Sequence, residues 1–139
     1  SGVRVNGYTA GTLTAVDIDD SVIEDNEYGV SGYTADATAT LRISVHRSWF
    51  ARNSNSAILG QSVAGAAVSL VAGNNLVAGN GTGVVALGAG TRVWASGNTI
   101  AQNGNGFQNS DAVFESAGNN AVRGNISDVV GVVTVVAPR

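Results

Sequence analysis

The sequence has no cysteine, a single proline (Pro138) and few charged residues. The absence of cysteine excludes disulfide bonds and thiolate metal sites. Charged residues make up only 12% of the 139 residues, the net charge is −3, and there is no basic patch, so binding to nucleic acid is disfavoured. No run of 18 apolar residues exists, so a membrane-spanning helix is not expected.

Glycine and small apolar residues, in contrast, are abundant. The 19 glycines are too many for helix interiors, and the apolar residues do not recur at helical spacing. Because proline occurs only near the end, the hydrogen bonds of a sheet would be uninterrupted along almost the whole chain. Hydrophobic residues make up 44% of the sequence, which suits a narrow core, and the length is that of one domain.

Five asparagines recur at nearly equal spacing, namely Asn26, Asn53, Asn80, Asn103 and Asn125. The intervals between them are 27, 27, 23 and 22 residues, and each interval contains a similar pattern of polar and apolar positions. A repeat of this length without helical periodicity is typical of a solenoid in which each period forms one turn. Repeats built from helix pairs are longer than this.

Other positions repeat together with these asparagines. A small polar residue lies five positions before each of them: Ser21, Ser48, Asn75, Asn98 and Asn120. An apolar residue lies three positions before each: Ile23, Phe50, Val77, Ile100 and Val122. Another follows four or five positions later: Val30, Ile58, Val84, Phe107 and Val129. Upstream, apolar and polar residues alternate, as in 41–45, which predicts a strand with one buried face.

The sequence therefore predicts an all-β fold, a single-stranded parallel β-helix (β-solenoid) of about five turns with three short strands in each. Strands of successive turns would lie about 4.8 Å apart and in register, so that equivalent side chains form columns. The apolar columns would form the core. The asparagines would form a ladder in which each side-chain amide donates to its neighbour's carbonyl, and we also expect them to adopt the left-handed backbone of sharp bends.

The two ends of the chain differ from the central repeats. We expect one domain over 1–139, with a partial first turn in 1–15 and closing strands in 129–139. The segment 113–115 does not alternate cleanly with the turn above it, which predicts a bulge. No capping helix precedes the first turn, and an uncapped end exposes apolar core and unpaired strand edges. The sequence thus predicts either further turns upstream or a homo-oligomer formed through the N-terminal end.

Three segments carry a family resemblance: NNLVAGNGTGV (74–84), SGNTIAQNGNGF (96–107) and AGNNAVRGN (117–125). From about Ala39 onward the chain resembles the right-handed parallel β-helix proteins of the pectate-lyase-like superfamily, and its final run resembles an uncharacterised group of secreted bacterial β-helix proteins. The resemblance implies a secreted or cell-envelope protein with polysaccharide ligands along one sheet face. Right-handed winding also agrees with the preference of parallel crossovers. No lyase active-site motif matches, so no catalytic residue carries over.

Charged residues gather in the first two turns and supply the candidate catalytic set. Aligned on the ladder, Asp19 and His46 share one outward column, with Asp17 and Arg42 nearby. Asp17 and Asp19 would lie roughly 6–7 Å apart on one face, near the carboxyl separation of inverting glycosidases. Alternatively, the acidic group could hold calcium for a lyase, with Arg42 or His46 as the base. The simpler interpretation, without a metal, is that an acidic turn stacked on a basic turn fixes the strand register.

Two tryptophans are the candidate carbohydrate-binding residues. Alternation places Trp94 outward, and Trp49 can also face out beside the core residue Phe50. An exposed indole on a flat sheet is a platform for a sugar ring or a contact in an oligomer. The sequence favours a non-catalytic module that presents a flat sheet for carbohydrate binding or self-association, without a cofactor. The alternative is a polysaccharide lyase or glycoside hydrolase acting through Asp17, Asp19, Arg42 and His46.

Overall fold

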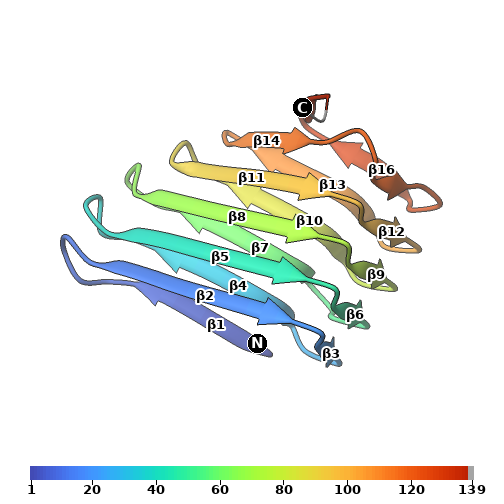
Figure 1. Cartoon of the computed structure of the whole chain (residues 1–139), viewed down its shortest axis with the longest axis horizontal. Helices are drawn as coiled ribbons and strands as arrows, with labels where there is room; N and C mark the ends of the chain where they lie inside the picture. The colour runs from blue at the N-terminus through green and yellow to red at the C-terminus, as the bar shows by residue number, and fades with distance from the viewer. Residues whose placement is uncertain (138–139) are drawn as a thin grey trace.

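The computed structural model describes residues 1–137, and Pro138 and Arg139 of the expected closing segment lie outside them. The described chain consists of strands and turns, which confirms the all-β prediction. Residues 1–137 include no helix of the length and hydropathy needed to span a bilayer. The chain winds as a coil whose strands fall into three parallel sheets (Figure 1).

Successive turns contribute one strand to each sheet in order. Sheet A contains β1 (Val3–Gly7), β4 (Tyr28–Thr34), β7 (Ser56–Ser62), β10 (Thr82–Leu87), β13 (Asn105–Ser110) and β16 (Ser127–Val130). Sheet B contains β2 (Leu13–Asp19), β5 (Thr40–His46), β8 (Ala67–Gly73), β11 (Thr91–Ser96), β14 (Val113–Ser116) and β17 (Thr134–Val135). Sheet C contains β3 (Val22–Glu24), β6 (Trp49–Ala51), β9 (Leu76–Ala78), β12 (Thr99–Ala101) and β15 (Ala121–Val122).

The coil is flattened, with sheet B in front of sheet A in Figure 1 and the narrow sheet C along one side. Strands of sheet B run in one direction across the front, and strands of sheet A return behind them, while the chain advances from the β1 end to the β16 end. This winding is right-handed, as the family resemblance and the preference of parallel crossovers imply (Figure 1). The strands β1 to β15 make successive groups of three, and β16 and β17 begin another group.

The core lies between sheets A and B and is closed at one side by sheet C. The predicted apolar columns are confirmed, since their central members are fully or almost fully buried: Val30, Ile58, Val84, Phe107, Phe50, Val77 and Ile100. Sheet B completes the core with Leu41, Ile43, Val45, Val68, Leu70 and Val93. The columns lose this cover in the last turn, where Val129 is largely exposed.

The asparagine ladder is also confirmed, and its atoms can be assigned. Each Nδ2 of Asn53, Asn80 and Asn103 donates to Oδ1 of the next asparagine at 2.9–3.0 Å. Each backbone N–H of these three residues donates to the same Oδ1 at 2.8–3.0 Å. The last member, Asn125, donates instead from its backbone N–H and Nδ2 to Oδ1 of Asp128 at 3.1 and 2.9 Å. Asp128 therefore ends the ladder by supplying the acceptor that a next asparagine would provide.

A second ladder runs along the small polar column, which the sequence did not identify as hydrogen-bonded. Asn75 Nδ2 donates to Asn98 Oδ1 at 3.0 Å, and Asn98 Nδ2 donates to Asn120 Oδ1 at 2.8 Å. Earlier in the chain, the backbone N–H of Ser48 donates to Asn75 Oδ1 at 3.0 Å, and that of Ser21 to Ser48 Oγ at 3.1 Å. Two polar columns therefore flank sheet C and satisfy the backbone where the chain bends into and out of it.

Two local predictions are wrong. The left-handed backbone belongs not to the ladder asparagines but to the residue before each one: Asp25, Arg52, Gly79, Gln102 and Gly124 have φ values of 52–72°. The ladder side chain points inward to bond with its neighbours, so the preceding residue makes the bend. The expected bulge in 113–115 is absent, because β14 pairs with β11 without interruption from Val113 to Ser116.

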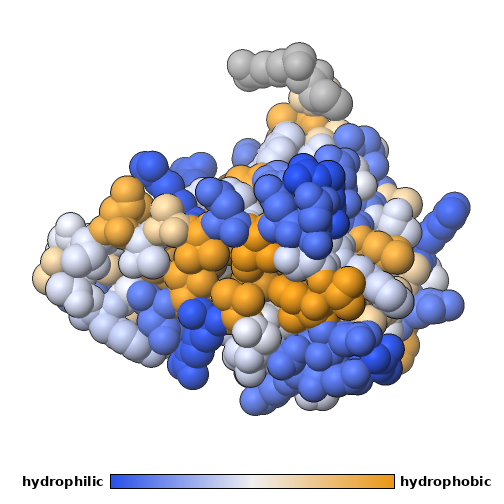
Figure 2. Space-filling model, turned by 60° about the horizontal axis from the view of Figure 1, so that its bottom comes forward, coloured by the Kyte–Doolittle hydropathy of each residue, from blue (hydrophilic) through white to orange (hydrophobic). Residues whose placement is uncertain are grey.

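The end formed by β1, β2 and β3 leaves strand edges free and covers the core only in part. Within residues 1–137, each of these strands has a paired neighbour on one side only. Hydrophobic residues cross the middle of this end between hydrophilic ones (Figure 2). The inward residues Val5, Ile18 and Ile23 are nevertheless buried, because the two faces of the flattened coil pack against each other. Val3 and Val16 are only partly buried, so this end presents free backbone edges together with a partly covered apolar band.

Candidate functional site

The charged strip of the first two turns has the register that the sequence predicts. Asp19 pairs with His46 and Asp17 with Ser44, so the acidic residues of β2 lie directly beside the outward residues of β5. Arg42 lies opposite Ala15 in the same strand pair, one outward position away from Asp17. The strip brings the four candidate catalytic residues onto one outer face of sheet B, and their catalytic role stays a prediction.

Ion pairs of the first two turns use Arg47 and Arg52 rather than Arg42 and His46. Arg47 Nε lies 3.0 Å from Asp20 Oδ1, and its Nη2 lies 3.5 Å from Asp19 Oδ1. Arg52 Nη2 lies 2.7 Å from Glu24 Oε2 and 2.8 Å from Asp25 Oδ2. All of these groups are exposed. One candidate catalytic carboxylate, Asp19, is thus engaged with an arginine of the next turn.

These arginines also change the acidity of their partners. The hydrogen bond from Arg47 lowers the pKa of Asp20, and the hydrogen bond from Arg52 lowers the pKa of Asp25. Asp20 and Asp25 have positive φ, as do Arg47 and Arg52, which follow them one turn later in the chain. The bends themselves therefore stack an acidic residue on a basic one. This arrangement agrees with electrostatic fixing of the register. Within residues 1–137, no three His, Asp or Glu side chains come together as a possible metal site.

The two candidate tryptophans lie on different sheets. Trp94 is on the outer face of sheet B, half-buried between Val71 and Glu115 of the neighbouring strands. Trp49 is on the outer face of sheet C, 44% exposed, between Val22 and Leu76. The indoles therefore cannot form one continuous platform. Trp49 borders a shallow depression of about 370 Å³ that also includes the Asp20–Arg47 ion pair.

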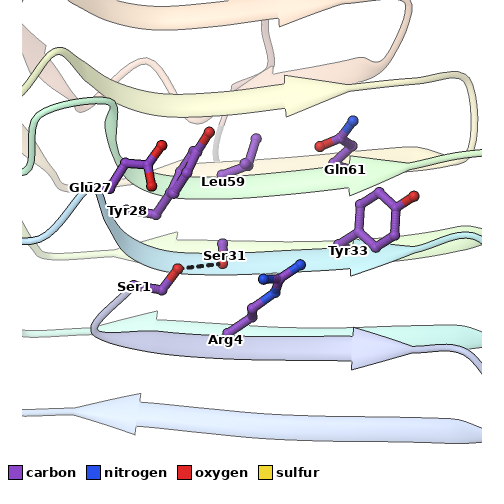
Figure 3. A pocket seen from close by; sticks show the side chains of 8 residues that line it. All are labelled: Ser1, Arg4, Glu27, Tyr28, Ser31, Tyr33, Leu59 and Gln61. Atoms are coloured by element: carbon purple, nitrogen blue, oxygen red, sulfur yellow. Dashed lines mark hydrogen bonds between the residues drawn. The ribbon is translucent and has the colours of Figure 1, made fainter.

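A better-defined site lies on the outer face of sheet A, where the sequence identified no functional residue. A groove of about 360 Å³ crosses β1, β4 and β7 (Figure 3). It is lined by Ser1, Arg4, Glu27, Tyr28, Ser31, Tyr33, Leu59 and Gln61. The strand register explains this set, because Arg4 pairs with Ser31, Ser31 with Leu59, and Tyr33 with Gln61.

The sequence of β4 creates the walls and floor of this groove. Val30 points into the core and Ser31 points outward; Gly32 faces the core again and Tyr33 faces outward. A Cβ on Gly32 would lie 2.2 Å from Ile43 Cδ1, so a larger residue here would require the Ile43 side chain to shift. Ser31 and Leu59 are outward yet nearly covered, which makes them the floor, while the tyrosines rise from the two ends of β4 (Figure 3).

Neighbouring residues hold both tyrosine rings in place. Asn55 Nδ2 donates to the hydroxyl oxygen of Tyr28 at 3.0 Å. The ring of Tyr33 packs against the ring of Tyr8 with their centroids 6.0 Å apart and tilted by 58°. Arg4 is oriented by a hydrogen bond from its Nε to Asn6 Oδ1 at 3.2 Å. The groove is therefore formed before any ligand binds.

Sequence reasoning missed this groove because it followed alternation only upstream of each ladder asparagine. Downstream, Gly29 and Val30 are both buried, which breaks the alternating pattern at the start of β4. The available signal was the pair Tyr28 and Tyr33, the only large side chains besides Val30 in that strand.

Comparisons with known proteins add no assignment to this geometry. Neither the family models, nor the curated proteins, nor the solved structures contain a match to the chain. The function must therefore be inferred from the outer faces of the solenoid and from the side chains that they present.

Proposed function

We propose that this protein is a non-catalytic carbohydrate-binding module, a secreted or cell-envelope β-helix of the pectate-lyase-like type. The observation that carries the proposal is the tyrosine-walled groove on the outer face of sheet A. Its polar residues Arg4, Glu27 and Gln61 line the groove together with the two aromatic rings, and Glu27 lies on the outer side of Tyr28 (Figure 3). The floor of the groove is nearly closed to water. Aromatic faces with a few fixed polar groups are the usual composition of a small-ligand site.

The solenoid is well suited to this role because it fixes the ligand-facing side chains. Most groove residues come from paired strands: β4 and β7 are hydrogen-bonded to a strand on each side, and β1, which carries Arg4, is hydrogen-bonded to β4. A pre-organised surface loses little conformational entropy on binding. The tryptophans on sheets B and C are separate candidate contacts, and the proposal gives them a secondary role.

A glycan-binding screen tests the proposal and separates it from the enzyme alternative. The protein should bind a subset of immobilised polysaccharides without releasing reducing ends or unsaturated products. Turnover that disappears in Asp19→Asn, with the fold intact by circular dichroism, would instead establish the lyase or hydrolase alternative. Binding that survives Tyr28→Ala and Tyr33→Ala but is lost in Trp94→Ala or Trp49→Ala would move the site to a tryptophan.

A second candidate function is self-association through β1, β2 and β3. Their unpaired edges lie at one end, and no residue within 1–137 donates a hydrogen bond to Asn26 Oδ1, whereas the opposite end of the ladder is closed by Asp128. Light scattering over a concentration series should then show an oligomer. Leu13→Lys on the β2 edge should reduce the mass, and Leu76→Lys, a comparably exposed site on sheet C, should not. A monomer at every concentration would exclude this candidate.

A further inference from the structure

We infer that the groove on sheet A takes a neutral, linear oligosaccharide whose chain lies along β4, with one ring against Tyr28 and another against Tyr33. This inference rests on the proposed carbohydrate-binding function and specifies the ligand. Tyr28 and Tyr33 are on the same strand, five residues apart. At the usual rise of a strand their Cα atoms are separated by about 16 Å.

The separation of the tyrosines determines the length of the ligand. A single sugar ring stacked on Tyr28 cannot also reach Tyr33, so both rings are used only by a chain of several units. Between them, Ser31 and Leu59 form a nearly covered floor, and the Arg4 side chain reaches from β1 toward β4 between Ser31 and Tyr33 (Figure 3). A chain that runs from one tyrosine to the other therefore passes over this floor and meets the Arg4 guanidinium on its way. Affinity should rise with chain length until both tyrosines are covered.

The polar side chains of the groove determine the charge of the ligand. They include one cation, Arg4, and one anion, Glu27, and no ion pair joins the two among the described residues. Gln61 adds an amide that both donates and accepts. Side-chain charge thus sums to zero across the groove, while donors and acceptors are interspersed. Sugar hydroxyls, which donate and accept at once, match such a surface without any charge on the ligand.

The strand pairing favours a sugar chain over an extended peptide. Strand β4 is hydrogen-bonded to β1 on one side and to β7 on the other. Its backbone cannot therefore accept an added peptide strand, which is how extended peptides gain most of their affinity on sheets. Only side chains face the groove, and the rings of Tyr28 and Tyr33 are held by Asn55 and Tyr8.

The test is a calorimetric titration series with defined oligosaccharides. The neutral probes are β-1,4-glucan, β-1,3-glucan, β-1,4-mannan and β-1,4-xylan oligomers of one, two, four and six units. The charged probes are oligogalacturonate and chitosan hexamers. We expect at least one neutral hexamer to bind at least about tenfold more tightly than its dimer, and Tyr28→Ala or Tyr33→Ala each to weaken hexamer binding by about tenfold.

Conservative and remote variants make the result specific. Tyr33→Phe keeps the ring and should retain hexamer binding, and Trp94→Ala, on sheet B, should leave it unchanged. Equal affinity for dimer and hexamer, or binding of the charged hexamers alone, would overturn the inference while leaving carbohydrate binding intact. Glycan binding that is unchanged in both tyrosine variants would also overturn the inference while leaving carbohydrate binding intact. Absence of binding to every probe would overturn both the inference and the proposed function.

Discussion

The replacement Asn80→Ala is the sharpest perturbation of this fold, because Asn80 is in the middle of the buried ladder. Its Nδ2 donates to Phe50 O at 3.1 Å and to Asn103 Oδ1 at 3.0 Å. Its Oδ1 accepts from the backbone N–H of Asn53 at 3.0 Å and from Asn53 Nδ2 at 2.9 Å. Alanine removes all four hydrogen bonds at a position that is almost completely buried.

The cost follows from the groups that lose a partner. The buried N–H of Asn53 keeps no acceptor, while its Nδ2 retains only the bond to Ile23 O at 3.1 Å. Each buried polar group left without a partner costs about 1–3 kcal/mol. The four lost hydrogen bonds, at about 1 kcal/mol each, lie in the same range, and we therefore expect Asn80→Ala to lower the free energy of unfolding by about 4 kcal/mol and the Tm by roughly 15 °C for a chain of this length.

The same substitution at the end of the ladder provides the matched control. Asn26 donates from Nδ2 to Glu24 O at 2.9 Å, and its backbone N–H keeps its bond to Asn53 Oδ1 after mutation. Asn26→Ala thus removes one partly exposed hydrogen bond, and the expected loss is about 1 kcal/mol. Because both variants replace asparagine by alanine, the difference between their losses of stability measures the effect of the position in the ladder.

Urea unfolding followed by far-UV circular dichroism measures both variants. Hydrogen exchange of the Asn53 amide should be recorded alongside, because solenoid repeats can unfold in segments rather than all at once. That amide should lose protection in Asn80→Ala and keep it in Asn26→Ala. Losses of stability within 1 kcal/mol of each other would refute the assignment of the ladder as the main polar support of the coil.

Three further predictions follow from the bends and the ladder end. Arg52 lowers the pKa of Asp25 below its ordinary value of 3.8. The ion pair therefore stabilises the protein above that pH, and this stabilisation is lost as the pH falls through the lower folded-state pKa. Acid-unfolding curves of Asp25→Asn should accordingly depend less on pH than those of the parent protein. Gln102 has a φ of 58°, so Gln102→Gly should raise stability by about 0.5 kcal/mol in urea unfolding, and a loss would contradict the strain at this bend. Asp128→Ala removes the acceptor for Asn125 and should cost about 1 kcal/mol, with faster exchange of the Asn125 amide, whereas Asp128→Asn, which keeps an Oδ1, should be nearly neutral.

The stacked ion pairs and the asparagine ladders both help to fix the register between successive turns. Inside, the asparagine columns satisfy the backbone at each entry to and exit from sheet C. Outside, Arg47 and Arg52 join the first two turns through exposed pairs, which contribute little each. Register in this fold therefore depends mainly on the buried amides and the apolar columns, and the surface charges refine it at one end.

The candidate sites show which features of a site the sequence can predict and which it cannot. The pairing of Asp19 with His46 could be predicted because both are at a fixed offset from a ladder asparagine. The groove could not, since its residues come from three turns and its shape depends on how Tyr28 and Tyr33 rise above Ser31 and Leu59. The repeat predicts which residues are neighbours in a column, but it does not predict whether their side chains enclose a groove.

The sequence alone determined the repeat, the parallel β-solenoid, the buried columns and the asparagine ladder, because a strict period forces equivalent residues to stack whatever the details of the bends. Only the tertiary structure decided which residue makes each bend, that the small polar column is a second ladder, and that Asp128 closes the first one. It also decided that the two tryptophans lie on different sheets and that the tyrosines of β4 wall a groove. These features depend on side-chain direction and on contacts between turns, which periodicity along a chain does not encode.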